Sequence, residues 1–72
     1  MFEGRTYKQV GYGARTIRFA DADCGVATTT YSYKLDDDER AAMARRITAA
    51  LNLTRFLSIE QLENSAPIGA TK

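Results

Sequence analysis

The chain has 72 residues, of which 44% are apolar and 26% charged, and its formal net charge is +1 at pH 7. A chain of this length forms one domain with a small core, so its stability is marginal or depends on a partner. The near-neutral charge argues against a strongly electrostatic nucleic-acid binder and against a protein that imitates DNA with massed carboxylates.

The sequence contains no histidine and a single cysteine, Cys24. This excludes an intrachain disulfide, the usual zinc sites and every acid–base scheme that uses histidine. We therefore expect a protein that is not an enzyme and that carries no cofactor and no metal. The opening residues, "MFEGRTYKQV", lack the apolar run of a signal peptide, and no segment reaches membrane-spanning length. A cytoplasmic protein with no membrane partner is the expectation.

Two strands are predicted in the first part of the chain. "RTYKQV" (residues 5–10) and "ARTIRFA" (residues 14–20) are rich in β-branched and aromatic residues, and "GYG" (residues 11–13) between them is typical of a turn. Side chains alternate across a strand, so Ile17 and Phe19 share one face of the second strand.

A third strand follows a second turn. "DADCG" (residues 21–25) predicts the turn, and the alternative of a paired-carboxylate or metal site is weak because the repeated oxygen ligands of a calcium loop are absent. "VATTTYSYKL" (residues 26–35) is the longest strand candidate. Together the three strands predict an antiparallel meander.

The second half of the sequence predicts a helix. It begins at "LDDDER", where Asp36 can cap and Glu39 can complete a capping box, and it ends around residues 52–55. The apolar side chains of this segment fall on one stripe that can cover the sheet. These are Met43, Ala44, Ile47, Ala50, Leu51, Leu53 and Thr54.

The start of a second, shorter helix follows directly. Ser58 can cap with Gln61 as the other half of a capping box, and Leu57 with Leu62 fit a hydrophobic staple. Phe56 is predicted to be part of an apolar elbow that holds this helix against the core.

The predicted fold is α+β, with a three-stranded antiparallel meander covered by one main C-terminal helix and a short second helix. A three-stranded sheet cannot bury its apolar face alone, so the helices form its covering layer. Residues 1–65 are predicted to form this single domain. Residues 66–72, which are rich in small residues, are predicted to form a flexible tail.

Basic and aromatic residues are interleaved in the strand region, where Arg15 and Arg18 lie among four tyrosines. Such a sheet could bind single-stranded nucleic acid. Direct nucleic-acid binding is the weaker hypothesis, because the tyrosine rings also align with the face that the helix must cover, where they would supply core area.

Recognition of a protein partner is the other hypothesis for the surface. Charged side chains at an interface set orientation and association rate, and both signs are present on the predicted helix. A homodimer is a further possibility, because a small core gains by burying more apolar surface. The candidate partner-binding residues are Arg15, Arg18, Asp36, Asp37, Asp38, Arg45, Asn52 and Arg55.

The segment "RITAALNLTRFLSIEQLE" resembles a C-terminal motif of small bacteriophage and prophage proteins. Their motif is an Arg-Ile pair, an asparagine five residues after the isoleucine, and a hydrophobic–Ser/Pro–x–Glu–x–Leu–Glu ending. The matching positions here are Arg46, Ile47, Asn52, Leu57, Ser58, Glu60, Leu62 and Glu63. The chain departs from the motif at residues 53–56, where small residues and a glycine are commoner.

This resemblance implies a phage origin and a location in the cytoplasm of the bacterial host. Phage genomes of this kind carry small non-enzymatic proteins that disable host defence, anti-CRISPR proteins among them. The resemblance therefore implies an inhibitor that occludes a surface of a host protein complex, with CRISPR effectors as the foremost target class. The alternative is a small nucleic-acid-binding regulator of phage development that uses the basic sheet residues.

Overall fold

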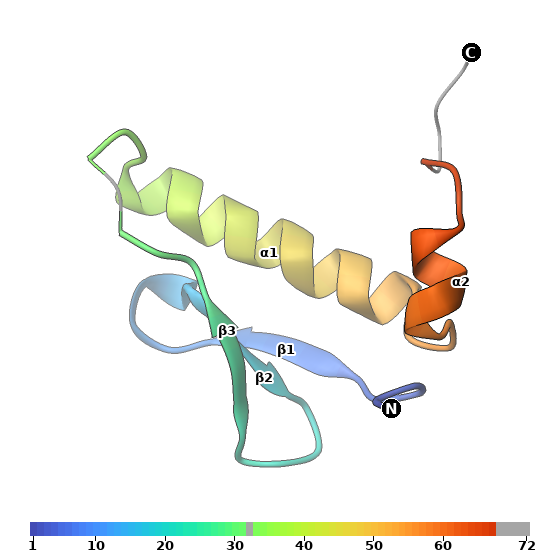
Figure 1. The fold of residues 1–72 in the computed structure, drawn as a ribbon. Coiled ribbons are helices and arrows are strands. Elements are labelled where there is room, and N and C mark those ends of the chain that lie inside the picture. Colours follow the sequence, from blue (N-terminus) through green and yellow to red (C-terminus); the bar gives the residue numbers. More distant parts are fainter. Residues whose placement is uncertain (32, 68–72) are drawn as a thin grey trace.

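A three-stranded sheet and a long helix make up the two layers of the protein (Figure 1). The computed structural model describes residues 1–31 and 33–67. Its elements are β1 (Tyr7–Val10), the 3₁₀ turn η1 (Tyr12–Ala14), β2 (Thr16–Phe19), β3 (Gly25–Thr28), α1 (Asp37–Leu53) and α2 (Ile59–Glu63). The strands pair antiparallel in the order β1-β2-β3. The predicted α+β class and the meander are therefore confirmed.

The core lies between β2 and α1. Ile17 has no exposed surface and Phe19 is 9% exposed, which confirms that they share the inner face of the sheet. Tyr7 pairs with Phe19 across the β1–β2 ladder, and the two ring centroids are 5.4 Å apart. Ala44 of α1, also fully buried, packs on this face because its small side chain lets the helix approach the sheet closely.

The turn between β1 and β2 depends on glycine. Gly11 and Gly13 have φ angles of +87° and +67°, a region that L-residues rarely adopt. A Cβ atom on Gly13 would also lie 2.9 Å from Nε of Arg15. The positive φ angles therefore favour glycine at this tip of the sheet.

The predicted third strand is too long. β3 ends at Thr28, and the described residues that follow it, 29–31 and 33–35, form no further strand. The reason is the length of its neighbour, because Thr28 pairs with Thr16, the first residue of β2. One more backbone hydrogen bond follows, from the Thr29 N–H to the Arg15 carbonyl at 3.0 Å, and before Arg15 the chain is in the η1 turn. Ser32, inside the predicted strand, lies outside the described residues, as do residues 68–72 of the predicted tail.

The start of α1 matches its prediction. The Asp36 side chain accepts from the backbone N–H of Glu39 at 2.8 Å, and the Glu39 side chain accepts from the backbone N–H of Asp36 at 3.0 Å. This reciprocal capping box satisfies two backbone donors that a helix start leaves unpaired.

The predicted apolar stripe of α1 is partly wrong. Ala44 is buried and Leu51 half-buried as expected, but Met43 is 46% exposed, Leu53 is 74% exposed, and Ala50 is exposed. Arg40, at 5% exposure, occupies the inner face instead. The helix is thus rotated away from the orientation that apolar content alone favours.

Two amides on the inner side set this rotation. Gln9 of β1 donates from Nε2 to the backbone carbonyl of Ala41 at 2.9 Å. Asn52 accepts from the backbone N–H of Tyr7 at 2.8 Å and donates to the Tyr7 carbonyl at 3.0 Å. Asn52 therefore serves the outer edge of β1 as a neighbouring strand would, because it pairs both backbone groups of one residue.

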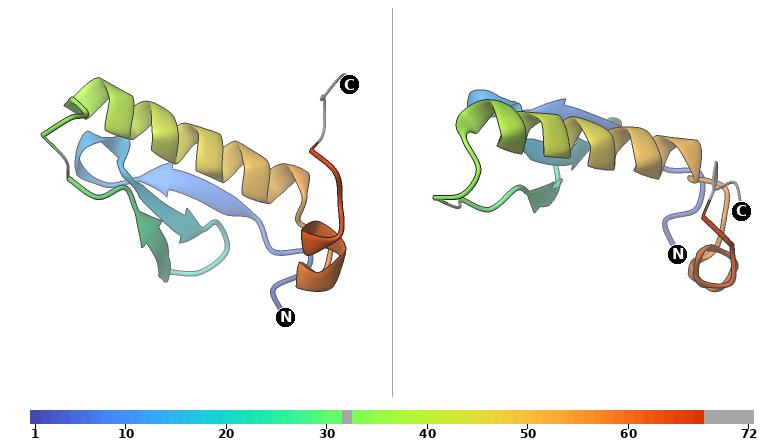
Figure 2. Two further views of the ribbon diagram at one scale, coloured as in Figure 1. Left: turned by 45° about the horizontal axis from the view of Figure 1, so that its top comes forward. Right: turned by 90° about the horizontal axis from the view of Figure 1, so that it is seen from above.

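The short helix α2 lies at the C-terminal end of α1, beside the N-terminal segment (Figures 1 and 2). Its predicted capping box is confirmed, since Ser58 accepts from the Gln61 N–H at 3.1 Å and Gln61 accepts from the Ser58 N–H at 2.8 Å. The predicted role of Phe56 is wrong, because its side chain is 72% exposed. A backbone hydrogen bond of 2.6 Å from Gly4 N–H to the Arg55 carbonyl ties the elbow to the N-terminal segment instead.

The tyrosines also differ from the prediction. Tyr12, Tyr31 and Tyr33 are 88%, 72% and 83% exposed, and only Tyr7 is partly covered. The expectation that these rings supply core area was therefore wrong for three of them. Tyr12 lies in the η1 turn, and Tyr31 and Tyr33 lie beyond the end of β3, so the alternation of a strand does not apply to them.

Candidate functional site

The predicted partner-binding residues do not form one surface. Asn52 was a candidate partner-binding residue, but both ends of its amide bind Tyr7 of β1. Arg18 forms an ion pair with Asp23 at 2.6 Å. Arg45 and Asp38 lie exposed on α1. Asp36 caps α1 and Asp37 pairs with Arg40, while Arg55 and Arg15 line two separate hollows near opposite ends of α1.

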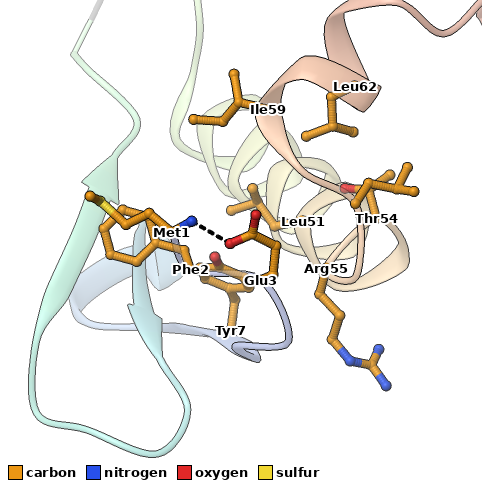
Figure 3. Close-up of a pocket in the computed structure, with 10 residues that line it drawn as sticks. Met1, Phe2, Glu3, Tyr7, Leu51, Thr54, Arg55, Ile59 and Leu62 are labelled. Carbon is orange, nitrogen blue, oxygen red and sulfur yellow. Dashed lines mark hydrogen bonds and ion pairs between the residues drawn. The ribbon is translucent and has the colours of Figure 1, made fainter.

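The first hollow, which we call the apolar groove, has a volume of about 170 Å³ and lies between the N-terminal segment, the end of α1 and α2 (Figure 3). It is lined mainly by apolar side chains. The lining residues are Met1, Phe2, Glu3, Tyr7, Leu51, Thr54, Arg55, Leu57, Ile59 and Leu62.

The apolar groove is largely open to solvent. Met1 is 87% exposed, Phe2 54%, Ile59 58% and Leu62 41%. Phe2 stacks on Phe19 with ring centroids 5.8 Å apart, so the groove continues the buried core outward. An apolar side chain that enters from outside would join this core.

Charged residues lie at the rim of the apolar groove. The guanidinium of Arg55 lies 4.6 Å from the centroid of the Phe56 ring and donates to the Asn52 carbonyl at 2.9 Å. The N-terminal amine of Met1 binds the Glu3 carboxylate, as the dashed line in Figure 3 marks. This hydrogen bond is the main cause that lowers the pKa of Glu3.

The second hollow, which we call the tyrosine–arginine hollow, has a volume of about 400 Å³ and lies where η1, the end of β3 and the start of α1 meet. Its walls combine aromatic rings, guanidinium groups and hydroxyls. The lining residues are Tyr12, Arg15, Thr16, Thr28, Thr29, Thr30, Tyr31 and Arg40. Of the predicted site residues, Arg15 lies in it, and Asp37 is linked to it through an ion pair with Arg40.

Arg40 is the residue that the sequence analysis missed. A single arginine in a helix of alternating charge looks like part of a solvated face. One signal was available, because Arg40 lies one helical turn before Ala44, four residues along the same face. The structure brings its guanidinium to 5.1 Å from the centroid of the Tyr31 ring.

Among residues 1–31 and 33–67, no three histidine, cysteine or acidic side chains lie close enough to hold a metal ion. Neither α1 nor α2 is sufficiently long and apolar to span a bilayer. Comparison with known proteins finds no family model, no curated protein and no solved structure that matches the chain.

Proposed function

We propose that this chain is a small, non-enzymatic binding protein that docks on a partner protein through the apolar groove. One observation carries the proposal, namely the exposed large apolar side chains that continue the core at Phe2, Ile59 and Leu62. Contiguous exposed apolar surface on a small soluble domain marks an interaction site. The buried apolar core of the described residues is small, comprising Ile17, Phe19 and Ala44, so a partner would add substantially to the buried area.

The anatomy of the groove suits a protein partner. Interfaces combine an apolar centre with a polar rim, and here Glu3 and Arg55 line the same groove as Ile59 and Leu62. Charges of both signs at the rim favour one orientation of the partner and speed its association.

We further propose that the partner is a host defence complex of a bacterium, with CRISPR effectors as the first target class to test. The support is the likeness of the C-terminal motif to phage and prophage proteins. Two residues of that motif, Leu57 and Leu62, line the apolar groove. On this proposal the protein acts in the cytoplasm of the bacterial host and inhibits by covering a surface of the complex.

The test mixes the purified chain with purified CRISPR effector complexes and follows co-elution by size-exclusion chromatography. Ile59→Glu places a charge in the groove. It should not disrupt α2, because an acidic side chain is favourable in the first turn of a helix. Met43→Glu is the matched control, since Met43 is 46% exposed but lies outside the groove. The expected result is co-elution that Ile59→Glu abolishes and Met43→Glu preserves. The proposal fails if no defence complex co-elutes and phage without the gene plaques equally on immune and non-immune hosts.

A second copy of the chain is another occupant to consider for the groove. Light scattering of the purified protein measures its mass directly. A dimer that Ile59→Glu dissociates would assign the groove to self-association, and a monomer would leave it to a different partner.

The alternative function, a nucleic-acid-binding regulator of phage development that uses the basic sheet residues, has less support. Arg18 is paired with Asp23, and Arg5 is paired with Asp21 at 3.1 Å. These carboxylates offset the positive charge that phosphates would need. Charge reversal at Arg15 and Arg18 separates the two functions, because it should abolish binding along the sheet and spare docking at the groove.

A further inference from the structure

The tyrosine–arginine hollow plays no part in the proposed docking, which uses the opposite end of the molecule. We propose that this hollow binds the phosphate of a nucleotide and stacks the nucleotide's base on an exposed tyrosine ring. The ligand class is a phosphate joined to an aromatic base, and a free nucleotide and a single-stranded nucleic acid both present it. This inference is independent of the partner at the apolar groove.

Arg40 is the first reason. Its side chain is 6% exposed, and among the described residues its Nε has no hydrogen-bond acceptor. One Nη2 donor binds the Asp37 carboxylate, which is 80% exposed. A buried guanidinium donor without an acceptor costs free energy. A hydrogen bond from this donor to a ligand oxygen therefore contributes more binding free energy than the same bond at the surface.

Arg15 supplies a second positive charge in the same hollow. Its Nε donates to the Tyr12 carbonyl at 3.4 Å, and the terminal nitrogens of its guanidinium are not used in that contact. Two guanidinium groups beside threonine hydroxyls form a donor set that suits phosphate oxygens, because a guanidinium can give two parallel hydrogen bonds to one phosphate. Thr28 and Thr30 line the hollow as well.

The exposed tyrosines explain why the ligand should carry a base. Tyr12 and Tyr31 are 88% and 72% exposed, so their rings are open to a ligand. Arg15 lies 5.5 Å from the Tyr12 ring centroid and Arg40 lies 5.1 Å from that of Tyr31. Each phosphate-binding cation is thus placed beside a ring that can stack a base.

Size and access agree with this assignment. A volume of about 400 Å³ lies within the range of small-molecule sites. Nε of Arg40 has no accessible surface, so a ligand oxygen can reach it only after a neighbouring group moves, and the nearby ring of Tyr31 can turn aside. Because most of that ring lies in water, the turn gives up little packing.

The experiment measures binding at low salt with three probes, which are inorganic phosphate, adenosine monophosphate and a short fluorescent thymidine oligonucleotide. Calorimetry serves for the small probes and fluorescence anisotropy for the oligonucleotide. Loss of one stacking ring should weaken binding about tenfold. The test variants are Arg15→Gln and Tyr31→Leu, both at sites where truncation leaves the core intact. Arg40→Met removes the buried charge and keeps most of the stem.

The matched controls remove the same groups elsewhere. Arg45→Gln takes an exposed arginine from α1, and Tyr33→Leu takes a tyrosine that does not line the hollow. We expect both controls to bind as the unmodified chain does. If adenosine monophosphate and the oligonucleotide bind with equal affinity, the ligand is a free nucleotide. If the oligonucleotide binds more tightly, the ligand is a single-stranded nucleic acid. Either result supports the site.

Three results would overturn the inference. The first is no binding of any probe at low salt. The second is equal weakening by Arg15→Gln and Arg45→Gln, which would indicate diffuse charge attraction in place of a site. The third is binding that Tyr31→Leu leaves unchanged, which would show that no base stacks there.

Discussion

Replacement of Asn52 by alanine should test whether one amide holds the two layers together. Asn52 pairs the backbone N–H and the carbonyl of Tyr7 at 2.8 and 3.0 Å, in a half-buried position between α1 and β1. Alanine keeps the helix, because alanine has the highest helix propensity, but it leaves both Tyr7 groups without their partner.

The expected loss follows from these two bonds. A hydrogen bond contributes about 1 kcal/mol net, and a buried backbone group left unpaired costs about 1–3 kcal/mol. Partial access of water reduces that cost, so we expect Asn52→Ala to lower the free energy of unfolding by about 2–3 kcal/mol. A chain of 72 residues has roughly 4–11 kcal/mol in total, so the change removes a large share of its stability.

Urea unfolding followed by circular dichroism measures this loss. With a slope of about 1 kcal/mol per molar urea for a chain this small, the midpoint should fall by about 2 M or more. Hydrogen exchange gives a second readout, since the Tyr7 amide should lose protection more than the amides of β2 do. Arg45→Ala, on the exposed side of α1, is the control and should change stability by less than about 0.5 kcal/mol. A loss this small for Asn52→Ala, with Tyr7 exchange unchanged, would refute the reasoning.

Three further predictions use the same unfolding assay. Arg40→Met should leave the free energy of unfolding unchanged or raise it, because a methionine fills much of the same space without an unpaired buried donor. A fall in that free energy of more than about 2 kcal/mol would show that the charge stabilises the fold. Asp36→Ala should cost about 1 kcal/mol through loss of the α1 cap, whereas Asp38→Ala, beside it, should stay within about 0.5 kcal/mol, and equal effects would contradict the capping role. The amine of Met1 lowers the pKa of Glu3 in the folded chain. This contact therefore stabilises the fold at pH values above the ordinary pKa of a glutamate, and that stabilisation is lost as the pH falls through the lowered pKa. Glu3→Gln should therefore reduce the fall in midpoint between neutral pH and about pH 3, and an unchanged fall would argue against the contact.

The candidate sites were less accessible to sequence analysis than the fold. Arg15 was identified from the sequence, but Arg40 was not, because its only sign of burial was its place one helical turn before Ala44. The exposed tyrosines were assigned to the core because strand alternation was extended to residue 35. Both errors arise from tertiary contacts, since the end of β3 is set by its neighbour β2 and the burial of Arg40 by the rotation of α1.

Local chemistry determined much of this protein from its sequence alone. Both helix starts follow from capping boxes at Asp36 and Ser58, and the buried pair of Ile17 and Phe19 follows from alternation along one strand. Such signals act within a few residues, so they can be recognised without the fold.

Tertiary structure alone decided the rotation of α1 and therefore which side chains are inside. The rotation depends on Asn52 reaching Tyr7 and on Gln9 reaching Ala41, two contacts between residues far apart in the chain. Buried polar groups require partners more strictly than apolar groups require any particular neighbour. These amides therefore outweigh the apolar stripe, leaving Met43 outside and Arg40 within.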